Sequence, residues 1–239
     1  MLLNLYTITW SNILEKKIIF IGFNKTATTS IHTTLKQNGI DSKHRAGVWR
    51  FKNRYNKLRQ VVNRREAVSD WGDTHVSMEV LLRLNSDFDN LLFVLNTRKL
   101  ENWIESRFKH YYFKKRWDFD NREFGLDDIS LENAQKFIGH RNEFYLKCSE
   151  SFDKNNLIIL DIGKDNFYDC ISSKLNFKIK RLDSKKNVRF ISNLGQDFIK
   201  KYNNVRNELS ELYNETMLNS VLTTNYCTNQ KLMQFENNI

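Results

Sequence analysis

The stretch Lys17-Ile18-Ile19-Phe20-Ile21-Gly22, followed at once by Phe23-Asn24-Lys25-Thr26-Ala27-Thr28-Thr29-Ser30, decides the fold. Its first part is a run of β-branched and aromatic residues that ends in glycine, which is typical of a buried strand. Residues 28–38 then have helical character, and Gly39 is placed to end that helix. A strand that leads through a short polar loop into a helix is the repeating unit of parallel α/β sheets.

Two later apolar runs, at residues 91–96 and 157–161, predict further buried strands of the same kind. Helices are expected between and after the strands, at residues 53–67, 78–84, 100–115, 131–152, 167–175 and 198–218. The alternation predicts a three-layer α/β fold, with a central, mostly parallel sheet flanked by helices. We expect one domain over residues 1–222 and a polar C-terminal tail over residues 223–239.

The composition is that of a folded protein, with 239 residues, 40% hydrophobic residues and 13% aromatic residues. No apolar run approaches the roughly 20 residues of a membrane span, and residues 1–15 do not resemble a signal peptide. Three widely spaced cysteines predict reduced thiols and a cytoplasmic location. The net charge of +10 attracts polyanions in general, but no base-reading motif predicts specific binding of nucleic acid.

The loop at residues 22–30 has the chemistry of a phosphate site. Backbone N–H groups at a helix N-terminus are unpaired, and the helix dipole favours an anion there. Lys25 adds a positive charge and the threonines add hydroxyl donors. The loop is not a Walker A motif, which needs lysine directly before the Ser/Thr that holds magnesium.

The order strand, Gly-x-x-Lys-Thr-x-Thr-Thr-Ser, helix resembles the 5′-phosphosulfate loop of sulfotransferases, usually written P-K-T-G-T-T. The sequence departs from that pattern at Asn24, in place of proline, and at Ala27, in place of glycine. If the loop needs a positive φ at residue 27, alanine costs about 1 kcal/mol there. The resemblance implies that the following residues bind the nucleotide sulfate donor: Asn24, Lys25, Thr26, Ala27, Thr28, Thr29 and Ser30.

A second segment, N-T-R-x-x-x-x-W-x-x-S-R at residues 96–107, follows the second strand. An arginine fork and a hydroxyl are good receivers for a terminal phosphate. Arg98 and Ser106 have the spacing of the 3′-phosphate signature of the same family, in the branch with bacterial, algal and viral carbohydrate-type enzymes. The resemblance implies 3′-phosphoadenosine 5′-phosphosulfate (PAPS) as donor, its bisphosphate (PAP) as product, and no metal. It also implies that the α/β fold is P-loop-like. Lys185, Lys186 and Arg189 are either further phosphate contacts or part of a solvated loop.

Sulfuryl transfer needs a group that stabilises the leaving oxygen and a base that takes the acceptor's proton. The resemblance assigns the first role to Lys25. For the base it favours His75, which stands 23 residues before Arg98 in a Thr-His pair, with Asp70 as the main rival. Asp73 and Glu79 follow as further candidates.

The acceptor is expected to be a hydroxyl or an amine, on a carbohydrate or a small molecule. His44, Arg45 and Trp49 lie where acceptor-binding loops often occur in the family. Residues 43–65 are strongly basic, which would suit an anionic sugar or would simply form a solvated helix face. The alternatives to a sulfotransferase are a nucleotide or small-molecule kinase with an atypical loop, and an inactive homologue that still binds PAP or PAPS.

Overall fold

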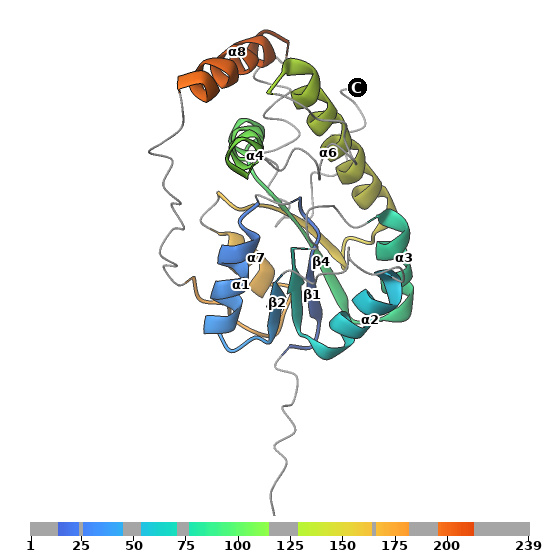
Figure 1. The fold of residues 1–239 in the computed structure, drawn as a ribbon. Coiled ribbons are helices and arrows are strands. Elements are labelled where there is room, and N and C mark those ends of the chain that lie inside the picture. The colour runs from blue at the N-terminus through green and yellow to red at the C-terminus, as the bar shows by residue number, and fades with distance from the viewer. Residues whose placement is uncertain are drawn as a thin grey trace, which may run out of the picture.

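The computed structural model describes residues 14–23, 26–44, 54–70, 77–114, 129–163, 166–181 and 196–212. Five parallel strands form one sheet in the order β2-β3-β1-β4-β5 (Figure 1). They are β1 (Lys17–Phe20), β2 (Ser42–His44), β3 (Ala67–Ser69), β4 (Leu91–Thr97) and β5 (Leu157–Asp161). The prediction of an α/β fold with a helix-flanked, mostly parallel sheet is confirmed, and every strand pair in this sheet is parallel.

Helices cover both faces of the sheet. The described helices are α1 (Thr28–Gln37), α2 (Arg54–Arg64), α3 (Met78–Asp87), α4 (Leu100–Lys114), α6 (Leu131–Ser151), α7 (Phe167–Ser172) and α8 (Gln196–Leu212). In Figure 1, α1 and α7 lie on one side of the sheet, α2 and α3 lie on the other, and α4 and α8 lie beyond the carboxyl ends of the strands.

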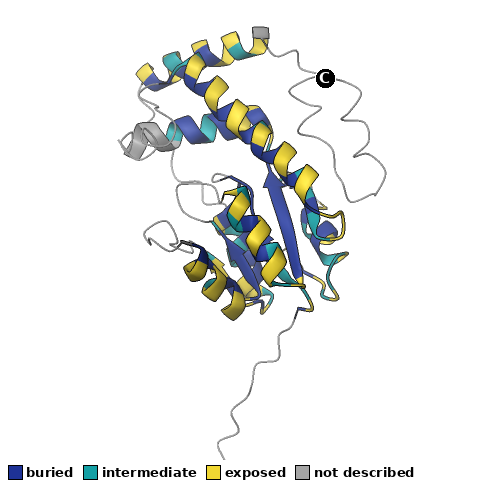
Figure 2. Ribbon diagram, turned by 90° about the vertical axis from the view of Figure 1, so that its right-hand side faces the viewer, coloured by how far each residue is buried: buried dark blue, intermediate teal, exposed yellow. Residues whose placement is uncertain are grey.

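The alternation of side chains along the strands divides the core into two clusters. Ile18 and Phe20 of β1 pack with α1 and α7, whereas Ile19 of the same strand packs with α2, α3, α4, α6 and α8. Strand β4 alternates in the same way, and all seven of its residues are buried. Figure 2 shows the result as buried strands beneath helices whose outer faces are exposed. The sheet is therefore covered on both faces, as its apolar strands require.

Two of the five strands were not expected from the sequence. Strands β2 and β3 are three residues long, and polar residues make up most of β2, so neither has the apolar run that identifies a buried strand. They are held by their neighbours instead: β3 pairs with β1 on one side and with β2 on the other. Their carboxyl ends bring residues 44 and 70 to the same edge as the loop after β1.

The two cysteines in the described part of the chain differ in chemical state. Cys148 on α6 is a buried free thiol, and burial raises its pKa to about 12. Cys170 on α7 is disulfide-bonded, so the prediction of reduced thiols is wrong for that residue. Within the described ranges, no helix combines the length and the apolar character that crossing a membrane requires.

Candidate functional site

The loop after β1 lies where the order of the sheet reverses. Strands β3 and β2 lie on one side of β1, and β4 and β5 lie on the other. In open α/β sheets, ligands bind outside the carboxyl ends of the strands at such a reversal. Register places Phe20 opposite Val94, so that Gly22 is level with Asn96 and Arg98 follows two residues later. The two predicted phosphate segments therefore begin at the ends of adjacent strands.

Asn96 holds the two sides of the loop together. Its side-chain Oδ1 accepts a hydrogen bond from the backbone N–H of Gly22 at 3.0 Å, while its Nδ2 donates to the carbonyl oxygen of Thr26 at 2.9 Å and to Thr26 Oγ1 at 2.6 Å. Thr26 Oγ1 in turn donates to the carbonyl oxygen of Phe23. Asn96 is fully buried, so water does not compete for these bonds. The loop between residues 22 and 26 is closed by a polar side chain from β4.

This closure explains why residue 22 is glycine. A Cβ atom at that position would lie 2.0 Å from the backbone oxygen of Asn96 and 2.6 Å from Asn96 Oδ1. Strand β4 thus approaches the loop backbone more closely than any side chain at residue 22 would allow. Asn96 was part of the quoted motif but was not predicted as a site residue, because its partners are 70 and 74 positions away in the sequence.

The N-terminus of α1 has no side-chain cap. Its N-cap residue is Ala27, with φ 60° and ψ 25°, and its first turn contains no acidic residue. By contrast, α3 and α6 are capped by Ser77 and Ser130, whose side chains accept hydrogen bonds from Val80 and Asn133 backbone N–H groups. The backbone donors of Thr28, Thr29 and Ser30 are thus placed at a helix end with the positive pole of the dipole and no built-in acceptor. The loop thus does need a positive φ at residue 27, which is the condition under which alanine was expected to carry a steric cost there.

The turn that carries Arg98 is supported from α6. Arg141, 1% exposed, donates through Nη2 to the carbonyl oxygen of Arg98 at 3.2 Å and through Nε to Tyr145 Oη at 3.2 Å. Its guanidinium lies over the rings of Trp103 and Tyr145, at 5.4 and 4.6 Å from their centroids. Burial raises the pKa of Tyr145, which therefore stays protonated. Arg98 itself is half-buried, and Ser106 is half-buried on α4.

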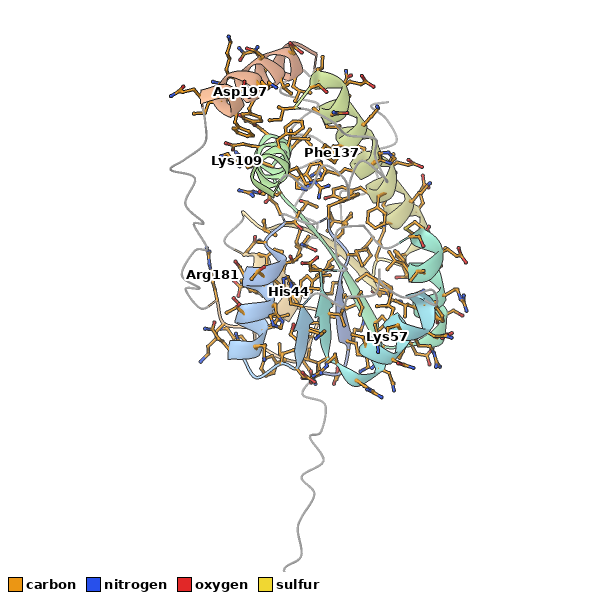
Figure 3. The ribbon with its side chains drawn as sticks, in the orientation of Figure 1. His44, Lys57, Lys109, Phe137, Arg181 and Asp197 are labelled. Atoms are coloured by element: carbon orange, nitrogen blue, oxygen red, sulfur yellow. The ribbon has the colours of Figure 1, made fainter. Side chains whose placement is uncertain are left out.

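A second group of polar side chains lies at the ends of β2 and β3. His44 Nε2 is 3.4 Å from Asp70 Oδ2 and 3.2 Å from Thr29 Oγ1, and His44 Nδ1 is 3.4 Å from Ser69 Oγ. Figure 3 shows His44 beside α1 and the edge strands. The structure thus brings together three predicted site residues. Thr29 was predicted to bind the nucleotide sulfate donor, His44 to bind the acceptor substrate, and Asp70 to be a candidate base. Their meeting was not foreseen, because it depends on the two short strands.

Asp70 also has a left-handed backbone, with φ 58°. Ala27 and Asp70 are the two non-glycine residues of positive φ in the described part of the chain. Such conformations cost of the order of 1 kcal/mol or more and cluster at functional sites. Both of these residues lie at the carboxyl edge of the sheet, next to the first turn of α1.

The basic helix α2 has a packing role as well as a charge. Tyr55, Leu58 and Val62 on it are buried in the core. Arg59 pairs with Asp87 at 2.7 Å, and Arg65 pairs with Asp41 at 2.8 Å. Two of the arginines counted toward a basic acceptor surface are therefore already neutralised by carboxylates.

Several predicted site residues lie outside the described part of the chain, and the structure does not place them. They are Asn24, Lys25, Arg45, Trp49, Asp73, His75, Lys185, Lys186 and Arg189. A scan of the chain against protein-family models gave no match, and neither did a search of curated proteins. Membership of the sulfotransferase family therefore stays a prediction from the two motifs.

Proposed function

We propose that the protein is a sulfotransferase that moves the sulfuryl group of PAPS to a hydroxyl or amine acceptor. The observation that carries the proposal is the loop between Gly22 and Thr26, closed by buried Asn96 and followed by an uncapped helix N-terminus. Such a loop suits the 5′-phosphosulfate of the donor. Arg98, two residues beyond Asn96 on the neighbouring strand, suits the 3′-phosphate, which is the group that distinguishes PAPS from ATP.

The chemistry asked of the protein is mainly positioning and charge stabilisation. Backbone N–H groups of residues 28–30 hold the donor's 5′ end, and the Arg98 fork holds its other phosphate. Lys25 stabilises the bridging oxygen as it leaves with negative charge. An acceptor oxygen or nitrogen then attacks sulfur in line, and a base removes its proton.

Binding of PAP tests the donor site without knowledge of the acceptor. At a PAP concentration 100 times its dissociation constant, the native state gains about 2.7 kcal/mol, which a thermal unfolding curve resolves. Arg98→Ala removes charge-assisted hydrogen bonds to the 3′-phosphate and should weaken PAP binding about 10- to 100-fold. Arg206→Ala is the matched control, because that arginine is exposed on α8 and pairs with Glu101.

Catalysis is then measured with labelled PAPS and a set of hydroxyl and amine acceptors, in the presence of EDTA. A sulfotransferase transfers label under these conditions, whereas a kinase needs magnesium. A wild-type protein that PAP does not stabilise, or an Arg98→Ala variant that binds PAP as tightly as the wild type, would contradict the donor site. Binding of PAP without transfer to any acceptor would favour an inactive homologue.

A further inference from the structure

The cluster at the ends of β2 and β3 is built by strand register. Parallel pairing places His44 opposite Ser69, the last residue of β3, and Asp70 follows directly after that strand. Helix α1 contributes Thr29 from its first turn, and Thr29 Oγ1 lies 3.2 Å from His44 Nε2. The imidazole thus joins the first turn of α1 to the edge of the sheet, where Figure 3 labels His44.

The two ring nitrogens of His44 have different partners, and this limits what the ring can do. Nε2 faces both Asp70 Oδ2 at 3.4 Å and Thr29 Oγ1 at 3.2 Å, while Nδ1 faces Ser69 Oγ at 3.4 Å. A histidine that activates a hydroxyl with carboxylate support uses one nitrogen for each partner. Here the hydroxyl and the carboxylate share one nitrogen, so His44 is not arranged to turn Thr29 into a nucleophile. A proton on Nε2 instead lies beside the Asp70 carboxylate, whose Oδ2 is 3.4 Å from that nitrogen.

The backbone of Asp70 is fixed in a conformation that few residues adopt without cost. Its φ of 58° is left-handed, and its side chain is 14% exposed, the same fraction as that of His44. Aspartate and asparagine tolerate this conformation better than most residues, because their short polar side chains bond locally. The carboxylate is thereby held at the sheet edge, partly open to solvent and next to the first turn of α1.

We propose that His44 is a positioning residue: through Nε2 it holds the Asp70 carboxylate beside Thr29, and Asp70 takes the proton of the acceptor. This rests on the proposed function. The acceptor oxygen forms a bond to sulfur, the bond from sulfur to the bridging oxygen breaks, and its electron pair leaves with PAP. The acceptor's proton goes to an Asp70 carboxylate oxygen. The acceptor group accordingly enters over the ends of β2 and β3.

Other charged groups near the imidazole set its surroundings. The ring of His32 on α1 stacks on that of His44 with centroids 5.5 Å apart, and His32 Nδ1 is 2.9 Å from Ser42 Oγ. Lys36 of α1 and Lys43 of β2 also act electrostatically on His32. The Asp70 carboxylate, whose Oδ2 is 3.4 Å from His44 Nε2, thus lies next to a group of basic side chains.

The test compares Asp70→Asn, His44→Ala and His44→Gln in PAP binding and in PAPS turnover, with water, glucosamine and phenol as acceptors. Asparagine fits the left-handed backbone and accepts from His44, so Asp70→Asn removes only the base. It should lower kcat by about 100-fold or more and leave the Kd for PAP unchanged. His44→Ala should lower kcat less, and His44→Gln should restore much of that loss, because its amide can donate to Asp70.

The pH–rate profile separates this arrangement from a base at His75. If Asp70 takes the proton, the acidic limb of kcat disappears in Asp70→Asn and persists in His75→Gln; the reverse result overturns the proposal. Equal kcat in Asp70→Asn and wild type overturns it as well. Failure of the wild type to bind PAP, or binding of PAP without any turnover, refutes the proposed function itself. His140→Gln and Asp197→Asn, on α6 and α8, are controls expected to keep wild-type kcat.

Discussion

The carboxyl ends of the central strands and those of the edge strands are held in different ways. Between β1 and β4, the loop is closed by Asn96, which is fully buried and bonds chiefly to backbone groups. Between β2 and β3, His44 and Asp70 are each 14% exposed and meet through side chains at 3.2 to 3.4 Å from their partners. One region is part of the core, and the other is a polar network at its margin.

The two regions should respond differently to substitution: contacts in the core are needed for folding, whereas contacts at the margin can be changed while the protein stays folded. A buried hydrogen bond to backbone contributes to stability and to loop shape together, and removing one partner leaves the other unsatisfied at about 1–3 kcal/mol. Contacts between partly exposed side chains at the margin contribute less to stability, because water competes for the same groups. Substitutions at the carboxyl ends of β1 and β4 should therefore change stability and ligand binding together. Substitutions at the carboxyl ends of β2 and β3 should change the catalytic rate while the fold is retained.

The largest effect is expected from Gly22→Ala at the centre. The new Cβ would lie 2.0 Å from the backbone oxygen of Asn96, and β1 and β4 must separate to admit it. We expect a loss of about 4 kcal/mol in the free energy of unfolding, at the upper end for single substitutions. Urea unfolding measures it, and PAP binding should be lost in parallel.

Gly139→Ala is the matched control, because a Cβ at residue 139 meets no atom within 4 Å. That residue lies inside α6, where alanine is about 1 kcal/mol more favourable than glycine. The two substitutions should therefore shift the urea midpoint in opposite directions. A Gly22→Ala protein as stable as the wild type would show that the loop is not closed against β4 as described.

The same contrast explains what the sequence could predict. Apolar runs identified β1, β4 and β5, because strands that are buried on both faces demand such runs. Strands β2 and β3 lack that signal. They are three residues long and form because neighbouring strands pair with them. Spacing along the chain predicted the loop and Arg98 as site residues, but it did not predict that Asn96 would close the loop or that His44 would lie beside Asp70. Those contacts join residues 26 to 74 positions apart, and they depend on how the strands pair.

A smaller effect, of opposite sign, is expected from Ala27→Gly. Residue 27 has φ 60°, where glycine avoids a steric cost of about 1 kcal/mol that alanine carries. The variant should gain about that much stability, measured by urea unfolding. Because the backbone keeps its conformation, PAP should bind the variant at least as tightly as the wild type.

Ala134→Gly provides the comparison for this substitution. Ala134 is buried within α6, where the same change removes a packed methyl group and adds backbone freedom, so stability should fall. A loss of stability in Ala27→Gly as well would mean that the left-handed conformation at residue 27 is not the one the folded protein adopts.

The smallest effect is a pH dependence at the edge, through His32. Burial first, and then His44, Lys36 and Lys43, lower the pKa of His32 below its usual value. The folded state thus resists protonation of His32 more than the unfolded chain does. Its contribution to stability is present above the usual histidine pKa of about 6.5 and is lost as the pH falls through the lowered value.

His32→Asn should therefore flatten part of the fall in urea midpoint between about pH 7.5 and pH 5, while asparagine can still bond to Ser42 Oγ. Thr33→Asn, at the next position of α1, alters the same helix without removing a titratable group and should keep the full slope. If His32→Asn instead steepened the slope, His32 would gain rather than lose protons on folding, and the edge would be stabilised by a charged imidazole.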